Sequence, residues 1–166
     1  MIPATEQLLQ EIVKQLSAFE VVEAIGRSGS EKAIPAAGEG DIDLFIYCRE
    51  IPDLVNRQAI FNHSNGLLPA VQSNVFQGGH WGVGDLVLLN GVETWLMYFT
   101  TAETTREVAA ILQGEYLERL DNYYYPTGRC AMLQEIQVFY DKTGFFGSIK
   151  DSLNARLRKL GAFTTV

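Results

Sequence analysis

The feature that most constrains this chain is a pair of aspartates, two residues apart, in a strand-like segment. The segment Asp41-Ile42-Asp43-Leu44-Phe45-Ile46-Tyr47 alternates acidic and apolar residues at its start and then becomes apolar. In a β-strand, residues i and i+2 point to the same face of the sheet. Asp41 and Asp43 are therefore predicted to direct two carboxylates to one place, while Ile42 and Leu44 enter the core.

Two carboxylates at one place repel each other and do not both ionise unless a cation lies between them. Ligand sets made of oxygen atoms favour a hard cation, Mg²⁺ or Mn²⁺. A turn of small residues, Gly29-Ser30, precedes the aspartates by a loop of ten residues. Such a turn has the composition of a phosphate-binding loop. The combination indicates metal-assisted chemistry on a nucleoside triphosphate.

The pattern of apolar residues predicts further elements around this segment. Thr5–Phe19 has the apolar stripe of an amphipathic helix, with Thr5 as its N-cap. A strand is predicted over Val21–Ile25, and a helix over Pro52–Phe61 with the proline in its first turn. Residues 62–84 carry clusters of Asn, Ser and Gly, which predict a loop with a short helical piece.

An Asn-Gly dipeptide between two apolar runs predicts a β-hairpin. The runs are Asp85–Leu89 and Val92–Thr100, and Asn90-Gly91 between them favours a type I′ turn. After residue 100 the apolar residues have helical spacing. Helices are predicted there over residues 102–120, 130–140 and 145–160.

Together these elements predict an α+β fold. We expect a mixed, partly antiparallel sheet of at least four strands with flanking helices, followed by a short helical segment. The predicted division is a core over residues 1–100 and a helical C-terminal segment over residues 101–166. A chain of 166 residues is long enough for one domain with a substantial core.

The motif resembles the signature of the nucleotidyltransferase superfamily whose founding shape is DNA polymerase β. That signature is an apolar residue, Gly and Gly or Ser, a loop, and then Asp-apolar-Asp-apolar. Gly29-Ser30 and Asp41-Ile42-Asp43-Leu44 match it in type and spacing. Within the superfamily the chain looks most like small bacterial nucleotidyltransferase-domain proteins, related to those that adenylylate antibiotics or proteins. The resemblance implies transfer of a nucleoside monophosphate, AMP in the first place, to a hydroxyl group with release of pyrophosphate.

The resemblance also implies which carboxylates are catalytic. Asp41 and Asp43 would hold Mg²⁺ or Mn²⁺, and Glu93 would supply the third metal-binding carboxylate and serve as base. On another alignment the third position falls on Trp95, which shares a strand face with Glu93. Asp85 is an alternative third acid, although a turn residue at the start of a strand is its simpler interpretation.

The phosphates of ATP or another nucleoside triphosphate would bind near the Gly-Ser pair. Gly29 and Ser30 would contact them directly. Many relatives carry an Arg and a Gly soon afterwards, whereas this chain has Glu31-Lys32-Ala33-Ile34, so Lys32 is the candidate for a phosphate-facing charge.

Composition limits the partners. A net charge of −7 argues against a nucleic-acid partner, whose phosphates need a basic surface, and suits a cationic acceptor. Cys48 and Cys130 are too few for a disulfide scaffold or a zinc motif, which favours reduced thiols and a cytoplasmic protein. The N-terminus lacks the pattern of a signal peptide, and no apolar run is long enough for a membrane span.

Several alternatives stay open at this level. The chain is an enzyme acting on a hydroxyl of a small molecule or a protein, or a non-catalytic nucleotide-binding or partner-binding member of the same fold. A third possibility is an antitoxin-like pair with a small helical partner, and a homodimer is also compatible with the sequence. His63 and His80 are candidate bases and Tyr123-Tyr124-Tyr125 a candidate nucleobase stack, with surface and packing roles as the simpler interpretations.

Overall fold

The computed structural model describes residues 4–29, 33–64, 66–78, 82–115 and 126–161. The elements along the chain are α1 (Thr5–Ser17), β1 (Val22–Arg27), β2 (Asp41–Cys48), α2 (Leu54–Asn62), β3 (Val71–Gln77), β4 (Val83–Leu89), β5 (Val92–Thr100), α3 (Thr101–Gln113), α4 (Pro126–Glu135), β6 (Gln137–Asp141) and α5 (Phe145–Gly161). None of the helices in these described ranges combines the length and the apolar character needed to cross a membrane.

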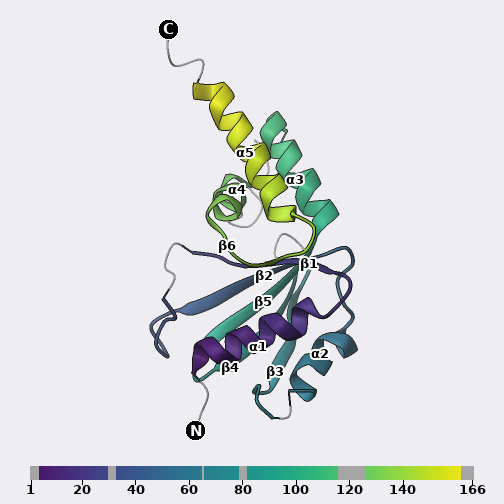
Figure 1. Cartoon of the computed structure of the whole chain (residues 1–166), viewed down its shortest axis with the longest axis vertical. Coiled ribbons are helices and arrows are strands. Elements are labelled where there is room, and N and C mark those ends of the chain that lie inside the picture. Colours follow the sequence, from purple (N-terminus) through teal and green to yellow (C-terminus); the bar gives the residue numbers. More distant parts are fainter. Residues whose placement is uncertain (1–3, 30–32, 65, 79–81, 116–125, 162–166) are drawn as a thin grey trace.

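The strands form one mixed sheet, in the order β3-β4-β5-β2-β1-β6 (Figure 1). β2 and β5 pair in parallel, and the other neighbouring strands pair antiparallel. The fold is therefore α+β with a mixed, partly antiparallel sheet, as the sequence predicts. β2, which carries the aspartate pair, lies at the centre of the sheet between β5 and β1.

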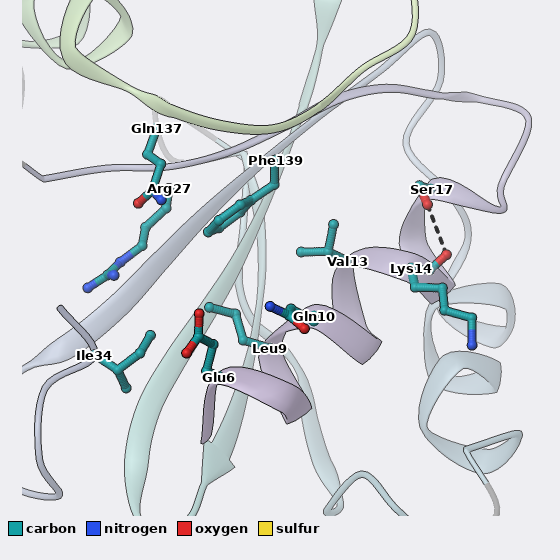
Figure 2. A pocket seen from close by; sticks show the side chains of 10 residues that line it. All are labelled: Glu6, Leu9, Gln10, Val13, Lys14, Ser17, Arg27, Ile34, Gln137 and Phe139. Carbon is teal, nitrogen blue, oxygen red and sulfur yellow. Dashed lines mark hydrogen bonds between the residues drawn. The ribbon is translucent and has the colours of Figure 1, made fainter. Parts of the chain in front are cut away.

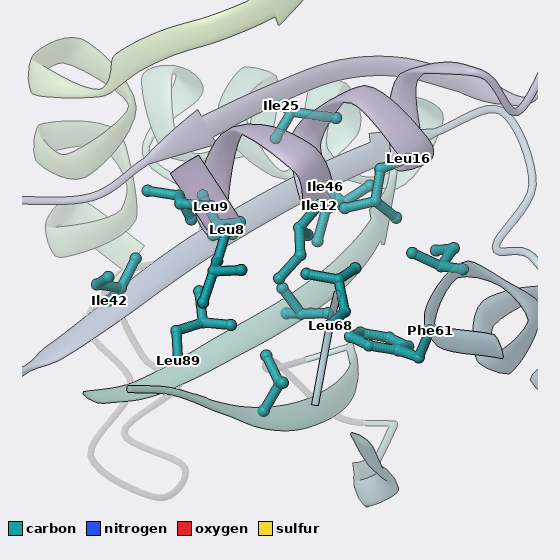
Figure 3. Packing of buried hydrophobic residues seen from close by; sticks show 14 of the residues in the cluster. Leu8, Leu9, Ile12, Leu16, Ile25, Ile42, Ile46, Phe61, Leu68 and Leu89 are labelled. Carbon is teal, nitrogen blue, oxygen red and sulfur yellow. The ribbon is translucent and has the colours of Figure 1, made fainter. Parts of the chain in front are cut away.

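Each face of the sheet has its own hydrophobic core, because alternate residues of a strand point to opposite sides. On one face, Ile42, Leu44 and Ile46 of β2 pack with apolar residues of α1 and α2 (Figure 3). On the other face, Phe45 and Tyr47 pack with apolar residues of α3, α4 and α5. Figure 1 shows these last helices grouped together, away from α1 and α2.

The second core covers only part of its face of the sheet. Phe45 and Tyr47 are buried there, whereas Asp43 is half-buried and Asp41 is exposed at the start of the same strand. Glu93, at the start of the parallel neighbour β5, is also exposed. The starts of β2 and β5 therefore form an open end of the sheet on the face that carries α3, α4 and α5.

The predicted hairpin is confirmed. β4 and β5 pair antiparallel, and Asn90 and Gly91 between them have φ angles of 51° and 82°. A type I′ turn needs positive φ at both central positions, which Asn and Gly tolerate best. The turn fixes the register of β5 and with it the position of Glu93.

Two of the predicted elements are wrong. Residues 62–84 contain the edge strand β3, which the pattern did not reveal because a bulge between Gln72 and Phe76 and a left-handed Asn74 (φ 54°) interrupt its alternation. The helix predicted over residues 130–140 ends at Glu135, and residues 137–141 form β6, which pairs with β1. The run Val138-Phe139-Tyr140 has the β-branched and aromatic composition of a strand.

Helix boundaries differ from the predictions for local reasons. Ala4 rather than Thr5 is the N-cap of α1, and its N–H donates to Gln7 Oε1 at 3.0 Å. α2 begins at Leu54, after Pro52, because Asp53 caps it by accepting the N–H of Asn56 at 2.8 Å.

The helix predicted over residues 102–120 stops at Gln113. Gly114 follows with a φ of 80°, the left-handed conformation that commonly ends a helix. Residues 116–125, including the three consecutive tyrosines, lie outside the described ranges.

Candidate functional site

The three carboxylates predicted for the site lie on one face of the sheet. In the parallel pairing of β2 with β5, Asp41 is opposite Glu93 and Asp43 is opposite Trp95. Residues that are opposite each other on neighbouring strands point to the same face. The fold therefore places Asp41, Asp43 and Glu93 on adjacent positions of the open end described above.

Two of these carboxylates line a common cavity. Asp41 and Glu93 contribute to the wall of a hollow of about 390 Å³, together with Leu88 and the glycines 38, 40 and 91. Glycine has no side chain to fill such a space. The cavity offers two acidic groups to a molecule that approaches the open end of the sheet, and Asp43 is not part of its lining.

The surroundings of Asp43 disfavour the charged form of its carboxyl group. Burial, followed by the negative charge of Asp41, raises the pKa of the Asp43 carboxyl, whereas a hydrogen bond from Ser28 and the charge of Arg27 act in the opposite direction. The Ser28 hydroxyl donates to Asp43 Oδ2 at 3.3 Å. A carboxylate whose charged form is disfavoured by burial and by a like charge gains most from a nearby cation.

Ser28 is a site residue that the sequence analysis missed. The predicted strand ended at Ile25, whereas β1 continues to Arg27 and the Ser28 N–H donates to the Asp43 carbonyl at 3.1 Å. The extra residues carry Ser28 alongside Asp43. The signal was present as the first serine of Ser28-Gly29-Ser30, whereas the superfamily pattern matches the second one, Ser30.

The turn after β1 is only partly described. Gly29 has a φ of 97°, a left-handed conformation that side chains rarely adopt, although a Cβ there would meet no atom within 4 Å. Glycine is therefore needed for the backbone conformation rather than for space. Ser30 and Lys32 lie outside the described ranges, and their phosphate contacts stay predictions.

The donor chemistry of the open end fits a hard cation. Asp41 and Asp43 provide two carboxylates on one face, and burial together with the charge of Asp41 raises the pKa of Asp43 despite the opposing effects of Ser28 and Arg27. Within the described part of the chain, however, no three acidic, histidine or cysteine side chains are grouped so that they could hold a metal ion. Asp41 and Asp43 would hold the cation, and Glu93 would have to turn toward it.

Asp85 is not a third acid of this site, and it is not a turn residue either. It lies within β4, fully buried, on the face that packs against α1 and α2. Asp85 Oδ1 accepts from Arg57 Nη1 of α2 at 2.5 Å and from the N–H of Asn74 at 2.9 Å. This network joins α2 to β3 and β4.

His63 is the C-cap of α2, and His80 lies outside the described ranges.

An aromatic pair borders the carboxylates on the side of β4 and β3. Trp95, half-buried and opposite Asp43, stacks on Phe76 of β3 with ring centroids 5.9 Å apart. Phe76 lies directly over Gly84, where a Cβ would come within 2.1 Å of the ring. The site thus has the turn at Ser28 and Gly29 on its β1 side and an aromatic surface on its β5 side.

Comparison with known proteins gives a likeness of fold only. No family model and no curated protein matches the chain. Among solved structures, a nucleotidyltransferase-like protein from Exiguobacterium sibiricum 255-15 is similar, with 14% sequence identity and a TM-score of 0.48. The match covers 91% of this chain and 39% of that protein, so this chain spans well under half of its length. A likeness at this level carries no reaction, substrate or site residue to this chain.

Proposed function

We propose that this protein is a metal-dependent nucleotidyltransferase that moves a nucleoside monophosphate, AMP in the first place, from a nucleoside triphosphate to a hydroxyl group. The observation that carries the proposal is the adjacent placement of Asp41, Asp43 and Glu93 on one face at the open end of the sheet. The turn at Ser28 and Gly29 beside them supports it. We further propose a cytoplasmic location, where nucleoside triphosphates are abundant.

The proposed reaction is attack of the acceptor hydroxyl on the α-phosphorus. A new P–O bond forms, the bond to the bridging oxygen breaks, and pyrophosphate leaves with its electron pair. At such a site, Mg²⁺ or Mn²⁺ would neutralise the negative charge of the phosphates and the charge that develops on the attacking oxygen. Asp41 and Asp43 would hold the ion, and Glu93 would accept the proton of the hydroxyl.

The order of the strands suggests how the two substrates would lie. Gly29, with Ser30 and Lys32, would bind the phosphates on the β1 side of β2. The acceptor would then approach from the β5 side, where Glu93 lines the cavity of about 390 Å³ and Trp95 offers an aromatic surface. The carboxylates favour an acceptor that carries positive charge.

Calorimetric titration of ATP, with and without Mg²⁺, tests the first half of this proposal. Asp43→Asn is expected to abolish the Mg²⁺-dependent part of ATP binding, because it removes the more buried of the paired carboxylates. Glu39→Gln is the matched control: it removes an exposed acidic charge from the loop before β2 without altering the sheet face. ATP binding that ignores Mg²⁺, or that is equal in the two variants, would contradict the proposal.

Release of pyrophosphate from labelled ATP tests the second half. Release is expected with hydroxyl compounds that carry amino groups, and Glu93→Gln is expected to slow it about a hundredfold, as for loss of a general base. The matched control is again Glu39→Gln. Release that continues unchanged in Glu93→Gln would remove Glu93 from the reaction.

A second candidate function is a non-catalytic nucleotide-binding or partner-binding protein with the same fold. It is favoured by the finding that no three metal-binding side chains among the described residues are grouped as a metal site. This alternative predicts that ATP binds, that Glu93→Gln leaves its affinity unchanged, and that no pyrophosphate is released with any acceptor.

A further inference from the structure

A second cavity, here called the α1–β6 cavity, lies on the opposite face of the sheet from the carboxylates. Its volume is about 320 Å³, and it is bounded by α1, by β6 and by Ile34 of the loop before β2 (Figure 2). Arg27 is opposite both Leu44 and Gln137 in the sheet and therefore points to the α1 face. The site proposed for nucleotide chemistry does not use this cavity.

The wall of the cavity is mainly apolar. Leu9 and Val13 come from α1, Ile34 from the loop and Phe139 from β6. Leu9 is buried, whereas Phe139 is 37% exposed, so the apolar wall runs from the core to the surface. Cavities of a few hundred Å³ with apolar walls and a small number of polar groups are typical of sites for small molecules.

One end of the cavity carries a buried positive charge. Arg27 is 5% exposed, and one of its guanidinium nitrogens donates to the Ala33 carbonyl at 2.9 Å. Figure 2 shows Arg27 beside Gln137 at one end of the cavity and Phe139 near its centre. Among the described residues of the wall, the other charged ones are Glu6 and Lys14; both are exposed, so water and salt screen their charges.

We propose that the α1–β6 cavity binds a small amphipathic anion, with its apolar body against Leu9, Val13 and Phe139 and its carboxylate toward Arg27. Burial of the apolar body supplies affinity. The guanidinium, which prefers carboxylates as partners, selects the charged end. The amide of Gln137, next to Arg27, offers a further hydrogen-bond donor to the same carboxylate.

Titration with octanoate, followed by amide NMR, tests this site. Saturable shifts are expected in residues around Val13, Ile34 and Gln137. Octanol, which has the same chain without the charge, is expected to bind at least about tenfold more weakly. Shifts spread over the whole surface, or equal affinity for octanoate and octanol, would overturn the proposal.

Two neighbouring residues of β6 provide a matched pair of variants. Phe139 lines the cavity, whereas Val138, 43% exposed, does not. Phe139→Ala is expected to weaken octanoate binding about tenfold, and Val138→Ala to leave it unchanged. Equal effects of the two substitutions would count against the assignment.

The charge is tested separately. Arg27→Gln is expected to remove the preference for octanoate over octanol. Since Arg27 is buried and this variant could be unstable, Val13→Phe serves as the second variant, because it fills the cavity from the half-buried face of α1. Octanoate affinity that survives Val13→Phe would place the binding elsewhere. Val13 and Phe139 line a cavity on the opposite face of the sheet from Asp41 and Asp43, so octanoate binding in their variants can fail without any effect on ATP binding, and the two proposals fail independently.

Discussion

At the scale of single residues, the proposed cation site depends on Asp43. Its carboxyl is half-buried next to Asp41, and its hydrogen bond from Ser28 only partly offsets the cost of its charge. Burial and a neighbouring like charge are the conditions under which a carboxylate favours either a proton or a cation. The neighbouring like charge follows from the Asp-x-Asp spacing on a strand, which the sequence predicts. The contact with Ser28 follows from the length of β1, which the sequence does not predict.

The raised pKa of Asp43 has a consequence for stability. A group whose pKa is higher in the folded protein than its ordinary value of 3.8 stabilises the fold while protonated, and this contribution is lost as pH rises through the folded value. In the absence of divalent cations, Asp43→Asn is therefore expected to raise the free energy of unfolding at pH 7 by on the order of 1 kcal/mol or less, since solvent screens part of the effect.

Urea denaturation of both proteins over a pH series, with chelator present, measures this effect. The gain from Asp43→Asn should shrink as pH falls through the folded pKa of Asp43. Mg²⁺ should then stabilise the wild type and not the variant. A variant that is less stable than the wild type at neutral pH without cations would contradict this description of Asp43.

Ser28 gives a second prediction at this scale. Ser28→Ala removes the hydrogen bond that lowers the pKa of Asp43, so that pKa is expected to rise further. Carboxyl NMR titration measures the shift directly. The control is Ser152→Ala, which removes a hydroxyl that donates to the Ser148 carbonyl on the exposed side of α5. An unchanged Asp43 titration in Ser28→Ala would show that this contact is absent in solution.

At the scale of elements, the sequence predicts those parts of the fold that have strong local patterns. β2, β5 and the turn at Asn90-Gly91 are confirmed because apolar runs of strand length and residues that tolerate positive φ leave few other conformations. β3 and β6 were missed because each is an edge strand whose formation depends on its neighbour. β3 carries a bulge at Asn74, and the arginine that holds that residue in place comes from α2, 17 residues earlier.

The hydrogen bonds among Arg57, Asp85 and Asn74 attach α2 to the sheet. Asp85→Ala leaves a buried guanidinium without its carboxylate and is expected to cost about 3–5 kcal/mol of unfolding free energy. The double variant Arg57→Met with Asp85→Leu is expected to recover most of that loss, because it removes both charges and fills the space. Urea denaturation measures the free energy of unfolding of both variants. A double variant as unstable as Asp85→Ala would contradict the view that the unpaired buried charge of Arg57 causes the loss.

At the scale of the whole molecule, the sheet separates two environments. α1 and α2 close one face, where the α1–β6 cavity lies, and α3, α4 and α5 cover the other face except at its open end (Figure 1). β6, which belongs to the predicted segment 101–166, pairs with β1 of the predicted core 1–100, so both segments contribute strands to the sheet. Which residues share the open end follows from strand order, and strand order is set by long-range pairing that no local pattern encodes.

The most direct test of the central claim is a crystal structure with Mn²⁺ and a non-hydrolysable ATP analogue, in which anomalous scattering locates the metal. We predict that Mn²⁺ is bound by the carboxylates of Asp41 and Asp43, with Glu93 turned toward it and the phosphates against Gly29. Mn²⁺ and nucleotide bound away from Asp43, or a nucleotide bound with no metal at these carboxylates, would contradict it.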